Sequence, residues 1–413
     1  MRRLLLLGVS CVVGWSLVGW CFIGWSFVGI SVARAGAPVS SALDVLRGAP
    51  NDGFARALAS RPFEFPRDHG PHPDFRHEWW YITGNLDSDT GERFGFELTV
   101  FRVGLVPPVS GGAAGGHDAG PVGRAGAGVA TAGGQRAAVD GPAAGGASAW
   151  RTREVYAAHF AITDVARGTF KFADRYSRGA LGLAGAQAEP FKAWLDDWVL
   201  GSTIHARGQG YELTLEVDNL GEPVLNGDHG LSRKSSEPGA ATYYYSIPRI
   251  KVHGRVAREG GVVSNVHGLA WLDREWGSGS LGTREQGWDW FALQLQDGSS
   301  LMFYSLRNRD GSLDPNSSGT WVDASGHTRR LTADQVTIDI SDHWTSPRGG
   351  RYPSRWRVRV PTAGLDAEVR PVLADQELGT QPRYWEGAVN LRGVQSGHET
   401  VGRGYVELVG YGE

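Results

Sequence analysis

Hydrophobic and polar residues alternate along most of the chain with the period of two that is typical of β-strands. The clearest case is Val266 to Leu306, where two aromatic-rich apolar runs flank a glycine-rich break. On the first run the alternation places these side chains on one face: His267, Leu269, Trp271, Asp273 and Glu275. The opposite face also holds large apolar residues, so this strand is expected to be covered on both sides. Buried carboxyl groups need partners or change their pKa, and this strand is therefore the best place to look for chemistry.

The same alternation predicts short strands along both halves of the chain, separated by turns rich in Gly, Asp and Pro. In the first half the predicted strands cover residues 74–86, 93–103, 154–164, 170–172, 191–195, 198–206, 211–219, 241–247 and 249–258. In the second half they cover residues 262–271, 288–296, 300–307, 319–322, 335–340, 355–360, 365–371, 384–392 and 402–408. Helical periodicity is scarce, so the chain is predicted to be all-β.

The two halves share a faint internal repeat of an aromatic strand, a turn, an apolar strand and an arginine. Trp79-Trp80-Tyr81 begins the first copy and Arg102 ends it, whereas Trp288-Asp289-Trp290 begins the second and Arg307 ends it. Many short strands in two similar halves predict two antiparallel barrels or sandwiches in tandem. Barrels of about eight strands can hold one small apolar ligand.

The N-terminus predicts export. A basic pair, Arg2-Arg3, precedes an uncharged apolar run, and Ala33-Arg34-Ala35 fits the pattern before a signal-peptidase cut. Residues 1–35 are therefore predicted to be a signal peptide of a secreted or periplasmic protein. The alternative is an uncleaved leader that associates with the membrane, because the run is long enough to span a bilayer.

Cleavage would change the chemistry available to the chain. Both cysteines, Cys11 and Cys21, lie in the leader, so the mature chain would hold no disulfide, thiolate metal site or cysteine nucleophile. Removing Arg2, Arg3 and Arg34 takes the net charge from −3 to −3 − 3 = −6.

Composition also suggests how the mature chain is divided. Residues 36–64 resemble a leader arm, residues 65–250 are expected to form the N-terminal domain and residues 251–413 the C-terminal domain. Within the first domain, residues 104–148 are rich in Gly, Ala and Val without periodicity, which predicts a disordered insertion in a surface loop.

Several function classes are disfavoured by the sequence. No concentrated basic stripe points to a nucleic-acid partner. The sequence contains neither a His-x-x-x-His pair on a predicted helix nor a cysteine pair, so no metal and no cofactor are expected. It also lacks a Gly-x-Ser-x-Gly elbow, which counts against serine hydrolysis.

Several short sequence motifs, called the family words below, occur in the same order as in one protein family. The words are His77-Glu78-Trp79-Trp80-Tyr81, Tyr244-Tyr245-Ser246-Ile247-Pro248-Arg249, Gly268-Leu269-Ala270-Trp271-Leu272-Asp273-Arg274-Glu275-Trp276-Gly277, Gly287-Trp288-Asp289-Trp290-Phe291, Arg351-Tyr352-Pro353, Tyr384-Trp385-Glu386-Gly387 and Gly404-Tyr405-Val406-Glu407. Together they resemble the secreted AttH-like branch of the carotenoid 1,2-hydratase (hydroxyneurosporene synthase) superfamily, from about Phe65 to the end of the chain.

The resemblance implies two tandem antiparallel lipocalin-like β-barrel or sandwich domains. It also implies hydratase chemistry, the addition of water to an isoprenoid double bond, with Asp273 at the position of the suspected proton donor. The AttH-like branch is associated with transporter operons and is often labelled a secreted hydrolase, so components of an ABC transporter are possible partners.

The candidate site residues follow from these observations. Asp273, Glu275 and His267 are the catalytic candidates, because a hydratase needs a neutral acid and a base and all three share one predicted strand face. The candidate ligand-binding residues are the aromatic and histidine side chains nearest to them in the family words: His77, Trp79, Tyr81, Tyr245, Trp271, Trp276, Trp288 and Trp290.

Three hypotheses remain open at this point. The protein is an exported carrier or chaperone of an apolar small molecule, an enzyme of isoprenoid-like hydration or cyclisation, or a structural envelope protein whose halves pack without a cavity. For each carboxylate the alternative role is a salt bridge to an arginine, and for most tryptophans it is core packing.

Overall fold

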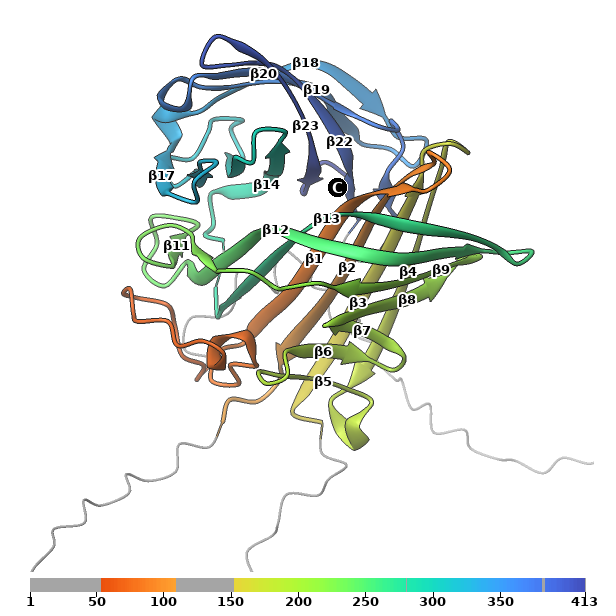
Figure 1. Ribbon diagram of the computed structural model, residues 1–413. Coiled ribbons are helices and arrows are strands. Elements are labelled where there is room, and N and C mark those ends of the chain that lie inside the picture. The colour runs from red at the N-terminus through yellow and green to blue at the C-terminus, as the bar shows by residue number, and fades with distance from the viewer. Residues whose placement is uncertain (1–52, 109–151, 280, 381–382, 413) are drawn as a thin grey trace, which may run out of the picture. The chain divides into compact units, whose positions relative to one another are not determined.

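The computed structural model describes residues 53–108, 152–279, 281–380 and 383–412. Nearly all regular structure in these residues is β-strand, in two antiparallel sheets (Figure 1). The predicted all-β class is confirmed. The helices among the described residues are short 3-10 turns, at Arg67–His69 (η1), Ala180–Gly182 (η2), Ala333–Gln335 (η3) and Pro361–Ala363 (η4). None of them is long and apolar enough to cross a membrane.

The first sheet runs in the order β4-β3-β2-β1-β13-β12-β9-β8-β7-β6-β5, with β10 and β11 also paired to β12. Its strands are β1 (His77–Ser88), β2 (Arg93–Gly104), β3 (Glu154–Asp164), β4 (Thr169–Arg178), β5 (Ala184–Gln187), β6 (Lys192–Leu195), β7 (Trp198–Gly201), β8 (Thr203–Gly208), β9 (Tyr211–Val217), β10 (Val224–Leu225), β11 (Leu231–Arg233), β12 (Ala241–Arg258) and β13 (Val262–Gly277). Strands β3 and β4 also contact β6 and β8, so the sheet curls until its two ends meet.

The second sheet runs in the order β17-β16-β15-β14-β23-β22-β20-β19-β18, with β21 paired to β22. Its strands are β14 (Glu285–Leu295), β15 (Ser300–Asn308), β16 (Ser318–Val322), β17 (Thr328–Thr332), β18 (Thr337–Thr345), β19 (Arg351–Val360), β20 (Leu365–Pro371), β21 (Glu377–Leu378), β22 (Tyr384–Gln395) and β23 (His398–Leu408). This sheet is curled as well (Figure 1).

The two sheets share one topology, as the internal repeat predicts. Four strands meander outward from β1 in the first sheet and from β14 in the second. The last strand of each half, β13 or β23, then pairs with that first strand on its other side.

The sheets divide between Gly277 and Glu285, later than the expected domain boundary between residues 250 and 251. Strand β12 runs through the expected boundary as one element of 18 residues. The sequence pattern predicts two strands that meet at Pro248, where the structure has a register shift between Ile247 and Ile250. A proline lacks the N–H needed for the ladder, and a bulge allows the strand to continue past it.

The inner face of each curled sheet is filled by side chains. Trp80, Trp198 and Trp276 belong to the buried cluster of the first sheet. Trp356 and Trp385 belong to that of the second sheet. The predicted ligand space inside a barrel is therefore occupied by the core in both halves of the described chain.

A third buried cluster joins the outer faces of the two sheets. It contains Tyr81, Tyr244 and Trp271 from the first sheet and Trp290 and Tyr405 from the second. Hydrogen bonds also cross this interface: Trp290 Nε1 donates to the Tyr244 hydroxyl over 3.0 Å.

The described end of the leader arm packs on the first sheet. The Ser278 hydroxyl donates to the carbonyl of Ala55, and the ring of Phe63 lies 5.5 Å from that of Trp276. The predicted signal peptide lies outside the described residues, as does most of the predicted insertion. The start of that segment is described, because Gly104 is the last residue of β2.

Candidate functional site

A cavity of about 500 Å³ lies between the two sheets. The first sheet contributes side chains from β1, β2, β3, β4, β12 and β13, and the second from β14, β15, β22 and β23. Its volume is within the ~300–1,000 Å³ range of sites for small organic ligands. A structural protein whose halves pack without a cavity does not account for this space.

The strand register brings the predicted residues together in this cavity. Antiparallel pairing places Tyr81 opposite Asp273, and Trp79 opposite Glu275. On the other side of β13, Ser246 lies opposite Asp273 and Tyr244 opposite Glu275. Since directly opposed residues of antiparallel strands project to the same face of the sheet, these side chains meet in one place.

Asp273 is a buried acid in the cavity wall. Its side chain accepts hydrogen bonds from the Ser246 hydroxyl over 2.5 Å, from Trp271 Nε1 over 2.7 Å and from the Tyr244 hydroxyl. Among the described residues no cation is paired with it. Burial raises the pKa of Asp273 to about 7, although these three hydrogen bonds act to lower it, and nearby Glu275 adds to the rise.

Glu275 lies in a different environment, although it is on the same face of the same strand. Lys234 Nζ is 3.0 Å from Glu275 Oε1, and the Thr242 hydroxyl also donates to that oxygen. The ammonium further lies 3.9 Å from the ring centre of Tyr304. Burial acts against the charge of Lys234, but the Glu275 carboxylate outweighs it and raises the pKa of Lys234. The Glu275 carboxylate is therefore the ion-pair partner of Lys234.

The second sheet adds Glu407 to the cavity wall. It accepts a hydrogen bond of 3.0 Å from Trp288 Nε1. Burial raises the pKa of Glu407 to about 7, and the charges of Glu275 and Asp273 contribute to the rise. Asp273 and Glu407 are therefore two carboxyl groups from opposite walls of the cavity whose pKa values are both raised to about 7.

Two further glutamates, Glu386 and Glu97, lie near Glu407. Strand pairing places Glu386 opposite Glu407, and Glu97 approaches from the first sheet. Burial raises the pKa of Glu97 and of Glu386 well above the usual range, and their mutual proximity disfavours ionising both. The described residues contain no group of three or more His, Cys, Asp or Glu side chains arranged to hold a metal ion.

Most of the sequence-predicted residues gather around this cavity. The residues that line it are His77, Trp79, Tyr81, Asp273, Glu275, Trp288 and Trp290. Trp271 lies directly behind this wall, because its indole N–H binds Asp273.

Three predicted residues lie elsewhere. His267 is exposed and does not line the cavity. Tyr245 and Trp276 point into the core of the first sheet, on the opposite faces of β12 and β13. The Tyr245 hydroxyl bonds His69 there, over 2.7 Å.

Sequence reasoning missed several residues of the site. Tyr244, rather than its neighbour Tyr245, faces the cavity, and the run of consecutive tyrosines carries no signal that distinguishes the two faces of the strand. Glu386 and Glu407 stand in the family words but were given no role. Lys234 lies in a loop segment without a motif, and no sequence signal identifies it.

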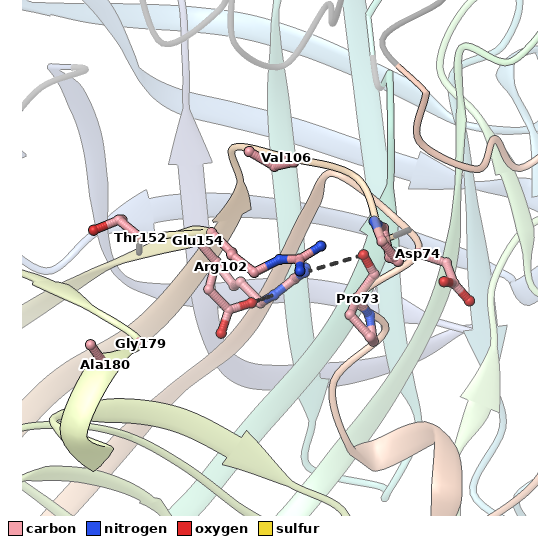
Figure 2. A pocket seen from close by; sticks show the side chains of 10 residues that line it. Pro73, Asp74, Arg102, Val106, Thr152, Glu154, Gly179 and Ala180 are labelled. Carbon is pink, nitrogen blue, oxygen red and sulfur yellow. Dashed lines mark hydrogen bonds and ion pairs between the residues drawn. The ribbon is translucent and has the colours of Figure 1, made fainter. Parts of the chain in front are cut away.

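Figure 2 shows a second, surface depression, of about 570 Å³. Arg102 lines both this depression and the cavity between the sheets. The Arg102 guanidinium is fully engaged: Nε lies 2.6 Å from Glu154, and Nη1 lies 2.9 Å from Glu78. The carbonyl of Pro73 is a further acceptor. Arg102 therefore separates the two hollows, and its charge is already neutralised.

Comparison with known proteins supports the interpretation of the fold and of the family. A family model described as AttH-like matches residues 56–411. A crystal structure of an AttH-type protein from Nitrosomonas europaea is 32% identical, with a TM-score of 0.68, over 87% of this chain and 99% of that one.

Two further similarities are to proteins named for adding or removing water. The crystal structure of kievitone hydratase from Nectria haematococca is 14% identical, with a TM-score of 0.57, over 89% of this chain and 98% of that one, which shows a shared fold. The dehydratase asqC of Emericella nidulans is 25% identical over 199 residues. That match covers 46% of this chain and about half of the dehydratase (55%).

Proposed function

Because the chain belongs to the AttH-like family, we propose that it binds an apolar isoprenoid- or lipid-like molecule between its two sheets and adds or removes water there, with Asp273 as the acid. The observation that carries the proposal is the Asp273 carboxyl group. It is buried at the wall of an aromatic cavity, it has three hydrogen-bond donors, and its pKa of about 7 leaves about half of it protonated at neutral pH.

Hydration would proceed in two steps. The Asp273 O–H bond breaks, and its proton forms a C–H bond with one alkene carbon while the other carbon becomes cationic. The ring faces of Trp79 and Trp290 in the cavity wall would stabilise that cation. Water then forms the C–O bond and gives a proton to the Glu407 carboxylate, and proton exchange between the two acids restores the starting state.

Dehydration is the same sequence in reverse. Asp273 would be the base that removes the proton from carbon, and Glu407 would protonate the departing hydroxyl. The matching pKa values of the two groups, both about 7, suit either direction. A kievitone hydratase among the structural neighbours and a dehydratase among the sequence relatives support this reaction class.

The test is turnover of simple isoprenoid probes in H₂¹⁸O. Myrcene and linalool differ by one water, so incorporation of ¹⁸O into linalool reports hydration, and loss of linalool to myrcene reports dehydration. Asp273→Asn is expected to lower turnover by about 10²-fold or more, the usual contribution of a general acid. Asp310→Asn, in an exposed turn, is the matched control. Full turnover in Asp273→Asn would exclude this role.

The alternative is a non-catalytic carrier that serves an envelope ABC transport system. The aromatic lining of the cavity supports ligand binding without requiring chemistry. If myrcene displaces the apolar dye Nile red from the wild-type protein but no ¹⁸O is incorporated, the carrier is favoured. Export remains a proposal, and N-terminal sequencing of the protein recovered outside the cytoplasm would test cleavage after Ala35.

A further inference from the structure

Two buried oxygen atoms in the cavity wall make no hydrogen bond of acceptable geometry with any described residue. They are the hydroxyl of Tyr81 and Oε1 of Glu386. Tyr81 is 7% exposed and Glu386 is 1% exposed, and both residues line the cavity. Tyr81 and Glu386 are close neighbours whose side chains affect each other's pKa, but they do not reach hydrogen-bond geometry with each other, and the nearby Tyr384 hydroxyl is already bonded to His159 Nδ1 over 2.8 Å. Buried polar atoms are rarely left unsatisfied, because leaving them so costs about 1–3 kcal/mol each.

These two atoms lie next to the proposed reacting groups. Tyr81 is the direct strand partner of Asp273, and Glu386 is the direct strand partner of Glu407. The ring of Tyr81 packs edge-on against Trp290, with 5.2 Å between centroids, and Trp290 is in turn opposite Glu407. The first sheet thus places the Tyr81 phenol beside Asp273, the proposed acid. The second sheet places the Glu386 carboxyl group beside Glu407, the proposed base.

The chemistry of this pair favours a neutral oxygen. Glu386 is buried close to Glu97 and Glu407, so burial and like charge raise its pKa and keep it protonated. A protonated carboxyl group can donate one hydrogen bond and accept another, as can a phenol. An anionic ligand group at this position would be buried beside Glu97, Glu386 and Glu407. No cation among the described residues is paired with any of these three, and the ammonium of Lys234 is already held by Glu275, so burying a further negative charge there would be costly.

We propose that Tyr81 and Glu386 form a subsite that binds a hydroxyl or carbonyl oxygen of the ligand. The inference rests on the proposed use of the cavity as the ligand site, and it narrows the substrate class to apolar molecules that carry a neutral oxygen function near the reacting carbons. It excludes fatty acids and other apolar anions as preferred ligands.

The experiment compares three C10 probes that share one skeleton type: geraniol with a hydroxyl, myrcene with no oxygen, and geranate with a carboxylate. Their affinities are measured by displacement of Nile red at pH 7. Wild-type protein is expected to bind geraniol roughly tenfold more tightly than myrcene, as one or two neutral hydrogen bonds allow, and to bind geranate most weakly.

Two variants test the subsite separately. Glu386→Leu and the conservative Tyr81→Phe are each expected to reduce the preference for geraniol over myrcene by at least threefold, with myrcene affinity unchanged. Tyr211→Phe is the matched control, since its hydroxyl binds Asp164 outside the cavity and its loss leaves the preference unchanged. Far-UV circular dichroism confirms that each variant is folded.

Failure of this inference is distinguishable from failure of the proposed reaction. A wild-type preference for geraniol that survives in both Glu386→Leu and Tyr81→Phe overturns the subsite, whatever the turnover. Geranate binding as tight as geraniol binding also overturns it. A third outcome separates the two ideas: the preference for geraniol is lost in both variants, but the wild type turns over none of the probes. That outcome supports the subsite and contradicts only the proposed hydration chemistry.

Discussion

Replacing Asp273 by Asn is expected to stabilise the folded protein, and to do so more strongly as the pH rises. The substitution keeps the shape of the side chain and one acceptor oxygen for the Ser246 hydroxyl and the Trp271 indole. It removes the ability to ionise in a buried position where no cation among the described residues is paired with the carboxyl group. The stability of the wild type should therefore depend on pH in a way that the variant's does not.

The sign and size follow from the pKa of this group. The pKa of Asp273 is about 7 in the folded protein and 3.8, the ordinary value, in the unfolded chain. The carboxyl group therefore ionises first in the unfolded chain, and the unfolded state becomes more favourable relative to the folded state as the pH rises from about 4 to 7. At 1.36 kcal/mol for each pKa unit, ionisation of this group lowers the stability of the wild type by about 1–2 kcal/mol at pH 5 and by about 4–5 kcal/mol above pH 7. The advantage of Asp273→Asn is thus expected to grow by roughly 3 kcal/mol between pH 5 and pH 8.5.

The assay is guanidinium unfolding of both proteins at pH 5 and at pH 8.5, followed by tryptophan fluorescence and circular dichroism. The control is Asp310→Asn, which replaces an exposed aspartate whose hydrogen bonds to Ser312 lower its pKa, so this variant should gain no stability with rising pH. An advantage of Asp273→Asn that is the same at the two pH values would refute the claim that the pKa of this carboxyl group is raised in the folded protein.

The remaining predictions concern activity and stability. Turnover of myrcene should follow a bell centred near pH 7, because it needs Asp273 protonated and Glu407 ionised; a flat kcat/KM between pH 5 and pH 9 would contradict this pairing. Arg274→Met should lower the free energy of unfolding by about 3–5 kcal/mol, because it leaves Glu78 buried without this partner. Urea denaturation would measure that loss, and adding Glu78→Leu should recover part of it; a double variant no more stable than the single one would argue against the ion pair. His267→Ala should change neither turnover nor stability beyond about 0.5 kcal/mol, since the side chain is exposed, and a tenfold loss of turnover would return His267 to the site.

The predicted strands agree well with the structure because a strand that is buried on one or both faces must repeat its side chains every two residues. Period two along β13 correctly placed Trp271, Asp273 and Glu275 on one face. The phase of β12 was not resolved, because the run Tyr243-Tyr244-Tyr245 has an aromatic residue at every position and no polar contrast marks its two faces.

The sequence by itself determined the all-β class, the doubled topology, the family and the central role of the Asp273 strand, because these depend on local alternation and on short motifs. Only the tertiary structure decided where the cavity lies. The inner faces of both sheets are filled by large side chains, so the space for a ligand opens between the outer faces. The partners that set the character of each acid, Lys234 for Glu275 and Trp288 for Glu407, come from distant parts of the chain, and such contacts leave no periodic trace in a sequence.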